Sequence, residues 1–167
     1  MRIASAVGVA TLAAGLGATP GALAAGGCTA RSTWGTATPS YERQVLDLVN
    51  QHRRSIGLRP LHRSAALTRA ARWKSKHMAR YHYFEHADPS GRSPFQRIAD
   101  CGFHRRLATG ENIAAGQRTP QAVVRGWLHS PGHRRNIEYA GFRYMGVGAV
   151  HRRGSVYGWY WTQDFGR

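Results

Sequence analysis

The side chains best suited to shared chemistry in this sequence are His86, Glu111 and His133. They lie in three short strings: Phe84-Glu85-His86, Gly110-Glu111-Asn112-Ile113-Ala114 and Ser130-Pro131-Gly132-His133-Arg134-Arg135-Asn136-Ile137. Two imidazoles and a carboxylate can bind a divalent cation and leave coordination positions open. They can also poise a water molecule or a proton donor. Because the strings are far apart in the sequence, a shared site depends on the fold.

His133 has the strongest local context of the three. Ser130-Pro131 has the residue types of a helix cap and a first helical position, which would place His133 in the first turn of a helix. The positive end of a helix disfavours imidazolium, so we expect a neutral His133 that can act as a ligand or a base. The alternative is a histidine that only bonds a backbone carbonyl. A serine hydrolase is disfavoured, because Ser130 is expected to cap the helix and the sequence has no Gly-x-Ser-x-Gly elbow.

Glu111 also has a purely structural alternative. In a chain with 24 Lys and Arg against 8 Asp and Glu, a carboxylate is expected to pair with an arginine. We expect the same of Glu138 and Asp164. The remaining histidines have no consistent spacing and are expected at the surface or the edge of the core: His52, His62, His77, His82, His104, His129 and His151.

Helix signals show which elements must position these residues. Thr38-Pro39 begins a helix that Gly57 ends, and a second helix is predicted from Ser64 to Tyr81, with Lys74 in its buried stripe. The turn sequence Asp88-Pro89-Ser90-Gly91 comes directly after His86, so His86 is expected in a loop. Three further helices are predicted from Ser93-Pro94 to Cys101, from Thr119-Pro120, and from Ser130-Pro131.

In the C-terminal part of the sequence the side chains alternate in character from one residue to the next, as is typical of β-strands. Strands are predicted from Tyr144 to His151 and from Ser155 to Asp164, around the turn Arg152-Arg153-Gly154. Tyr157, Trp159 and Trp161 would share one face and Tyr160 the other, which indicates a strand covered on both sides. We therefore predict an α+β fold with helices packed around a small, mainly antiparallel sheet.

The N-terminal segment is typical of an exported protein. Residues 1–24 have a basic start, an apolar stretch and small residues before a cleavage point, as in a secretory signal peptide. Residues 25–38 are predicted to be a flexible lead-in, and residues 39–167 the folded domain. No later segment is apolar enough to cross a membrane. We expect a secreted protein, either free or associated with the cell wall.

Export makes a disulfide between Cys28 and Cys101 the expected use of the two cysteines. It would tie down an otherwise loose N-terminal arm. A lipid-modified Cys28 is the competing interpretation, since small residues precede it. A catalytic pair of Cys101 with His104 is less well supported, because an exported thiol tends to be oxidised.

The formal net charge of +16 rests almost entirely on arginine, since Lys74 and Lys76 are the only lysines. Such a surface binds polyanions, and an exported protein meets wall polymers and anionic lipid first. We expect no specific nucleic acid partner. The alternative is a compositional bias toward arginine without a specific partner.

Taken together, the strings resemble the CAP superfamily (cysteine-rich secretory proteins, antigen 5 and plant pathogenesis-related proteins), and in particular its bacterial secreted branch. The resemblance covers residues 41–165, nearly the whole mature chain. It is carried by Phe84-Glu85-His86, Asp88-Pro89-Ser90-Gly91-Arg92-Ser93-Pro94-Phe95, Gly110-Glu111-Asn112-Ile113-Ala114, Trp127-Leu128-His129-Ser130-Pro131-Gly132-His133-Arg134, Gly146-Val147-Gly148 and Trp161-Thr162-Gln163. It implies a three-layer α-β-α sandwich with a large open cleft. We expect the protein to be a monomer.

The resemblance also implies a site. Members with a full set of residues place two histidines and two glutamates in the cleft, and some bind a divalent cation through the histidines. His86, Glu111 and His133 match three of these four positions, while Ser130 stands where the second glutamate is expected. The implied cleft residues are His86, Glu111, Asn112, Ser130 and His133.

Three functions follow as hypotheses. The leading one is a secreted binding module for a divalent metal (Zn²⁺ or Mg²⁺), an anionic or sterol-like lipid, or a wall-derived ligand. The second is a metal-dependent hydrolase with His86 and His133 as ligands and Glu111 as the base. The third is a basic surface-adhesion or toxin-like protein, which would use only the charge.

Overall fold

A computed structural model describes residues 28–104 and 108–167 of the chain. The predicted signal peptide, residues 1–24, lies outside these described residues. The elements in chain order are η1 (Ser32–Trp34), β1 (Thr36–Ala37), α1 (Pro39–Ser55), β2 (His62–Arg63), α2 (Ala65–Tyr81), α3 (Pro94–Asp100), β3 (Thr109–Ala115), α4 (Pro120–Leu128), α5 (Pro131–Glu138), β4 (Tyr144–His151) and β5 (Trp159–Gly166).

The strands form one mainly antiparallel sheet in the order β1-β4-β5-β3, with β2 pairing in parallel to β4. In the described residues β3 pairs only with β5, so it forms an edge of the sheet. The register sets Glu111 of β3 directly opposite Asp164 of β5. Directly opposite residues share a face of the sheet, so these two carboxyl groups are neighbours.

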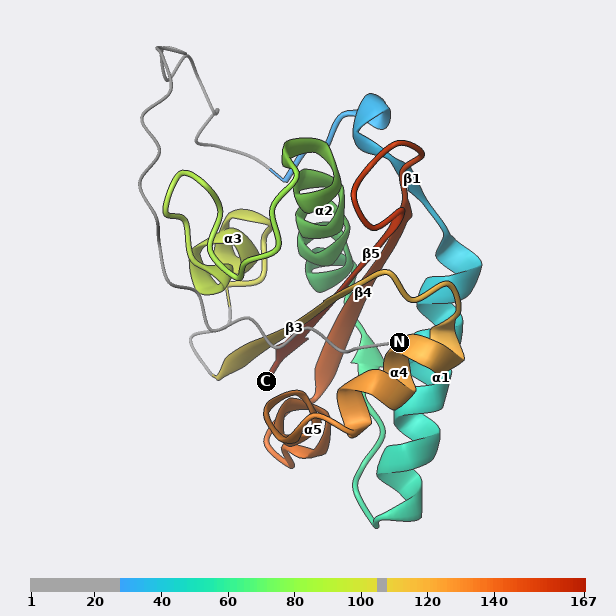
Figure 1. The fold of residues 1–167 in the computed structure, drawn as a ribbon. Helices are drawn as coiled ribbons and strands as arrows, with labels where there is room; N and C mark the ends of the chain where they lie inside the picture. The colour runs from blue at the N-terminus through green and yellow to red at the C-terminus, as the bar shows by residue number, and fades with distance from the viewer. Residues whose placement is uncertain (1–27, 105–107) are drawn as a thin grey trace.

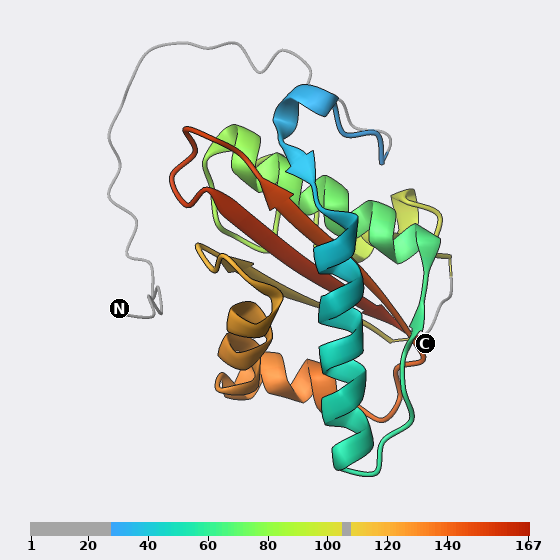
Figure 2. The ribbon, with the colours of Figure 1, turned by 90° about the vertical axis from the view of Figure 1, so that its right-hand side faces the viewer.

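Helices cover both faces of the sheet, as Figures 1 and 2 show. Helix α2 packs against β4 and β5, and α3 lies beside it next to β3. Helices α1, α4 and α5 cover the opposite face and contact one another. The predicted three-layer α-β-α arrangement is therefore confirmed.

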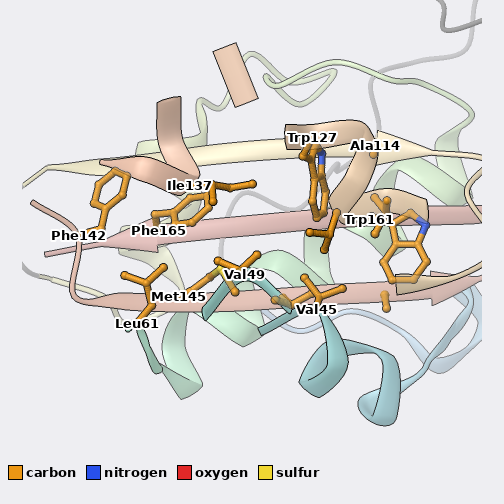
Figure 3. Packing of buried hydrophobic residues seen from close by; sticks show 14 residues of the cluster. Val45, Val49, Leu61, Ala114, Trp127, Ile137, Phe142, Met145, Trp161 and Phe165 are labelled. Carbon is orange, nitrogen blue, oxygen red and sulfur yellow. The ribbon is translucent and has the colours of Figure 1, made fainter. Parts of the chain in front are cut away.

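The larger hydrophobic cluster lies between the sheet and α1, α4 and α5. Trp127 and Trp161 are its largest side chains, and both are almost completely buried. Figure 3 shows them over the strands, with Val45 and Val49 of α1 in the same cluster on the same face of the sheet. Burying two indole rings and the surrounding aliphatic groups holds these three helices on the sheet.

Two glycines allow α2 to lie very close to β4 on the other face. A Cβ atom added to Gly148 would lie 2.3 Å from the Ala71 carbonyl oxygen. One added to Gly146 would lie 2.1 Å from the Leu67 carbonyl carbon. Ser75 adds a direct link, because its hydroxyl donates to the Gly148 carbonyl at 3.1 Å. Helix α2 is therefore held against the sheet at backbone contact distance.

The predicted helices are confirmed. Where both ends of a helix were predicted, the observed ends lie within one or two residues of them. Thr119 caps α4 through Ala122 N, and Ser64 caps α2 through Leu67 N. Thr38 and Ser130 stand at the N-cap positions of α1 and α5, but their side chains form no capping hydrogen bond. The expectation that Ser130 caps the helix of His133 is therefore wrong.

The second C-terminal strand begins later than predicted, at Trp159 instead of Ser155, and continues to Gly166. Gly154 and Gly158 both have positive φ angles, +73° and +70°, which suit a wide turn and not a strand. Tyr157 therefore lies in the connection. Trp159 and Trp161 stack on one face, while Tyr160 packs on the other, as expected.

The predicted lead-in has defined structure from Cys28 onward. Cys28 and Cys101 form a disulfide, which rules out a lipid on Cys28 and a catalytic thiol at Cys101. Trp34 of η1 packs edge-on against Trp73, and β1 pairs with β4. Among the described residues, no helix is both long and apolar enough to span a bilayer.

Candidate functional site

His86 lies on the loop that follows α2. The helix ends at Tyr81, and His82 adopts a left-handed conformation (φ 58°) that turns the chain away. Helix α3 begins only at Pro94, so His86 is in a loop as predicted. Its side chain is 53% exposed, which leaves the ring open to solvent.

Lys74 of α2 anchors this loop from below. Its ammonium group is completely buried and donates to the carbonyl oxygens of His86 at 2.9 Å and Ala87 at 3.2 Å. It also lies 3.3 Å from Asp88 and 3.1 Å from the Tyr83 hydroxyl. Burial lowers the pKa of Lys74 to about 8, with a further contribution from the charge of Arg97. The predicted buried stem of this lysine therefore ends in a buried polar network.

Asp88 is the acceptor at the centre of that network. Its carboxylate accepts from Lys74 at 3.3 Å, from Arg92 at 3.0 Å and from Arg97 at 2.9 Å. Burial raises the pKa of Asp88, but the charges of Arg97 and Lys74 outweigh it, so the pKa lies below its ordinary value. His77, whose Nδ1 lies 2.8 Å from the Tyr83 hydroxyl, has a pKa lowered to about 4, chiefly by burial. The network thus combines ionised partners with a neutral imidazole.

Glu111 connects this network to His86. One carboxylate oxygen lies 2.8 Å from His86 Nδ1, and the other accepts from the Arg97 guanidinium. Arg97 is completely buried and bonds both Glu111 and Asp88, so it crosslinks β3 to the loop. A carboxylate beside a guanidinium can only accept, so the Nδ1–H of His86 donates to Glu111, and Nε2 is the ring nitrogen that this bond leaves unengaged.

Asp164 lies opposite Glu111 in the register; the sequence predicted only that it would pair with an arginine, and this is wrong, since no such ion pair forms among the described residues. It is completely buried, and neither of its oxygens has a hydrogen-bond partner among the described residues. Burial, and then the negative charge of Glu111, raises its pKa well above the ordinary value. Burial therefore favours the protonated, neutral form of Asp164. The alternation Tyr160, Thr162, Asp164 on one face of a strand was the only signal that could have placed it.

His133 reaches the same area from the other face of the sheet, at the start of α5. Its backbone carbonyl accepts from Asn112 Nδ2 at 3.0 Å. Asn112 also donates to Gln163 at 3.1 Å and accepts from Asn136 at 2.8 Å. Asn112 is completely buried, so the structure places it beneath the site as the residue that fixes α5 on β3.

The two imidazoles influence each other electrostatically. Burial lowers the pKa of His133, and the charge of His86 lowers it further. His133 is therefore biased toward the neutral form, in the direction predicted from the sequence. The causes are burial and a neighbouring histidine, whereas the sequence pointed to the helix N-terminus.

The structure thus brings His86, Glu111 and His133 to the free edge of β3, with Asn112 inside the fold and Ser130 at the N-cap of α5. Among the described residues, no group of three or more His, Cys, Asp or Glu side chains is arranged to hold a metal ion. Both Glu111 oxygens are already engaged, so Glu111 orients His86 and is not a free third ligand. The arrangement offers two imidazole donors at most.

Comparison with known proteins shows which family and which proteins this chain resembles. A family model described as the cysteine-rich secretory protein family, CAP, matches residues 46–165. The uncharacterized protein YkwD of Bacillus subtilis is 42% identical over 134 residues, covering 78% of this chain and 50% of YkwD. The uncharacterized membrane protein YlbC of the same organism is 33% identical over 132 residues, covering 79% of this chain and 36% of YlbC. The chain therefore spans half or less of these curated relatives.

Solved structures of two bacterial proteins have the same fold as this chain. An extracellular SCP-domain protein of Bacillus anthracis is 32% identical, with a TM-score of 0.69, covering 77% of this chain and 41% of that one. An outer surface protein of Borrelia burgdorferi, 19% identical, shares the fold with a TM-score of 0.71, covering 80% of this chain and 98% of that one.

Proposed function

This chain belongs to the cysteine-rich secretory protein (CAP) family, and from that premise we propose that it is an extracellular binding module that holds a divalent cation between His86 and His133. The predicted signal peptide and the Cys28–Cys101 disulfide support an oxidising, extracellular location. The similarity to an extracellular protein of Bacillus anthracis supports it further.

The observation that carries the proposal is the hydrogen bond between His86 and Glu111. A metal-binding histidine commonly donates its other ring N–H to a carboxylate, which fixes the tautomer and makes the free nitrogen more basic. His86 has this arrangement, with Nδ1 2.8 Å from Glu111 and an exposed ring. Its Nε2 is thus prepared as a ligand.

His133 supplies the second donor. A histidine must be neutral to bind a metal, and the lowered pKa of His133 keeps it in that form. Two imidazoles favour Zn²⁺ over Mg²⁺, which prefers oxygen ligands. Two protein ligands leave further positions for water or for an anionic oxygen of a wall-derived or lipid ligand.

A binding role is better supported than hydrolysis. A bound zinc ion would act as a Lewis acid, but a hydrolase also needs a base to take the proton of the attacking water. Both oxygens of Glu111 already accept from His86 and Arg97, so the carboxylate proposed as that base is occupied. Asp164 is buried beneath it and out of contact with solvent.

Zinc titration of the untagged mature chain by calorimetry tests the proposal. At about pH 7.5, where free imidazole is neutral, we expect binding by the parent and none by His86→Ala/His133→Ala. His62→Ala/His129→Ala removes two exposed histidines outside the site and should bind like the parent. Glu111→Gln should bind about 10- to 100-fold more weakly, as expected when the partner of a ligating histidine is changed.

The affinity should also fall below about pH 6, as the imidazoles protonate. Equal binding by the parent and the His86→Ala/His133→Ala variant, or binding by neither, would show that the proposed metal site is wrong.

A further inference from the structure

The end of the molecule where α2 finishes carries four exposed apolar or aromatic side chains, which we call the hairpin-end surface: Tyr81, Phe84, Val156 and Tyr157. Their exposed fractions are 39%, 39%, 69% and 47% in that order. Tyr81 ends α2 and Phe84 follows it, while Val156 and Tyr157 lie in the connection between β4 and β5. Exposed apolar groups gathered in one place mark a binding surface more often than scattered ones do.

Contacts between the segments show that this surface is continuous. The rings of Phe84 and Tyr157 lie 6.0 Å apart, which joins the loop after α2 to the β4–β5 connection. Trp34 of η1 lies 5.7 Å from Tyr81, and Arg152 donates to the Thr33 carbonyl. In Figure 1 the end of α2, η1 and the β4–β5 connection lie together at the top of the molecule.

The β4–β5 connection is supported from inside. Tyr157 contacts the completely buried Tyr160, with ring centroids 5.8 Å apart. The neighbouring residue, Val156, is not part of the buried core and is 69% exposed. The structure therefore presents a branched aliphatic side chain to the outside beside two aromatic rings.

The charges around this surface are almost all positive. Arg31, Arg80 and Arg153 are exposed, and the guanidinium of Arg80 lies over the Tyr81 ring at 5.4 Å. Arg152 is half-buried. The loop after α2 carries two acidic side chains: Glu85, which is exposed, and Asp88, which is buried and bonded to Lys74, Arg92 and Arg97. The surface is thus complementary to an anionic partner.

The combination of arginine with exposed aliphatic and aromatic groups selects one kind of partner. Wall polyanions and nucleic acids would satisfy the arginines, but they offer nothing apolar to Val156. The interface of an anionic bilayer offers phosphate to arginine and a partly apolar layer to Tyr, Phe and Val. We propose that the hairpin-end surface docks this protein on an anionic phospholipid bilayer.

In this docked state Val156 and Tyr157 enter the headgroup region, and Arg80 and Arg153 contact lipid phosphates. Phe84 is two residues before His86, so docking brings the loop that carries His86 to the membrane. The proposal does not depend on a metal, because none of its residues is a ligand of the proposed zinc site.

Co-sedimentation of the mature chain with vesicles tests the docking. Vesicles that contain phosphatidylglycerol should bind the parent, and vesicles of phosphatidylcholine alone should bind it far more weakly. Val156→Ser/Tyr157→Ser should lose about tenfold in affinity through lost apolar burial. Arg80→Glu/Arg153→Glu should lose at least about 20-fold, since each basic residue near an anionic membrane contributes roughly fivefold.

Matched variants distinguish binding through this surface from nonspecific binding due to net charge or exposed apolar groups. Arg134→Glu/Arg135→Glu makes the same charge change on two exposed arginines of α5, which lies at the opposite end in Figure 1. Ile56→Ser/Tyr139→Ser removes two comparably exposed apolar groups, at 47% and 45%. Both controls should bind within about twofold of the parent.

An equal loss in a hairpin-end variant and its control would overturn the proposal, because net charge or general apolarity would then explain the binding. No binding to either kind of vesicle would overturn it too. Tighter binding to a purified anionic wall polymer than to vesicles, with Val156→Ser/Tyr157→Ser unaffected, would assign the surface to the wall instead. Unfolding curves for every variant show that the fold is intact.

Discussion

Adding one methyl group at Gly148 should destabilise the fold and move the loop that carries His86. The Cβ of Gly148→Ala would lie 2.3 Å from the Ala71 carbonyl oxygen and 2.4 Å from its carbon. Ordinary contacts begin at 3.4 Å, so the atom falls short of normal contact by about 1 Å. The obstacle is the backbone of α2, which cannot rotate away as a side chain can.

The structure indicates the size of this effect. Helix α2 must move off β4, which strains the bond from Ser75 to the Gly148 carbonyl. Overpacking a core costs about 1 to 3 kcal/mol, and a clash with backbone belongs at the upper end of that range. For a domain of this size about 3 kcal/mol corresponds to a fall in melting temperature of roughly 10 °C. Lys74 moves with α2, so the His86 loop loses its anchor and zinc binding should weaken as well.

Urea unfolding followed by circular dichroism measures this change, with Gly126→Ala as the matched control. Gly126 lies inside α4, and a Cβ added there meets nothing within 4 Å. Alanine in a helix interior is more favourable than glycine by about 1 kcal/mol, so this control should gain stability. Equal midpoints for Gly148→Ala and the parent would refute the close approach of α2 to β4.

Three further perturbations have definite expected signs. The pKa of Lys74 is about 8 in the fold against 10.5 in its absence. Between about pH 8 and pH 10.5 Lys74 is therefore protonated in the unfolded chain but not in the folded one. The free energy of unfolding should rise by about 3 kcal/mol over this pH range. Lys74→Met should lack this rise in urea unfolding at stepped pH, and parallel pH curves would contradict it. Asp164 has a raised pKa, so its contribution to stability is lost as pH rises, and Asp164→Asn should stabilise the fold more at about pH 7 than at about pH 4. A uniform loss at both pH values would show that the acid is not neutral in the fold. Replacing Cys28 and Cys101 by Ser should cost at most about 4 kcal/mol and expose the N-terminal arm to proteases. Unchanged cleavage of the reduced chain would contradict the anchoring role.

Local signals in the sequence were enough for most of the fold. Thr119-Pro120 and Ser93-Pro94 begin helices because Ser and Thr suit the N-cap position and proline suits the first helical position, and both helices form with the expected cap bonds. The two strands β4 and β5 were predicted from the alternation of apolar and polar side chains in the C-terminal part of the sequence. That prediction is wrong at residues 155–158, where Tyr157 continues the alternating pattern but Gly158 has a positive φ, so the strand begins only at Trp159.

The candidate site was only partly predictable, because its support comes from residues far apart in the sequence. Arg97 carries no local pattern and the alternation around Asp164 gives only its face of the strand, yet both lie next to Glu111 once β3 pairs with β5 and α3 covers it. Lys74 was expected in the core only by its helical spacing. Its role under His86 depends on where the loop after α2 returns, which periodicity does not specify.

Ser130 offers a way to rebuild the part of the site that this chain lacks. The family resemblance places a second glutamate at this position, and the hydroxyl of Ser130 forms no capping bond that a substitution would break. A glutamate at the start of α5 is also favoured by the positive end of the helix. It stands three residues before His133, so a carboxylate there can join the two imidazoles as a third ligand.

We therefore expect Ser130→Glu to bind zinc at least about tenfold more tightly than the parent, as a third protein ligand completes the set that zinc sites favour. Ser130→Gln has the same length without the charge and should bind like the parent. Calorimetry at about pH 7.5 compares the three chains, and unfolding curves confirm that each is folded. The gain must disappear when His133→Ala is added to Ser130→Glu. A gain that persists without His133 would mean that the new carboxylate binds metal elsewhere, and that His86 and His133 do not form one site.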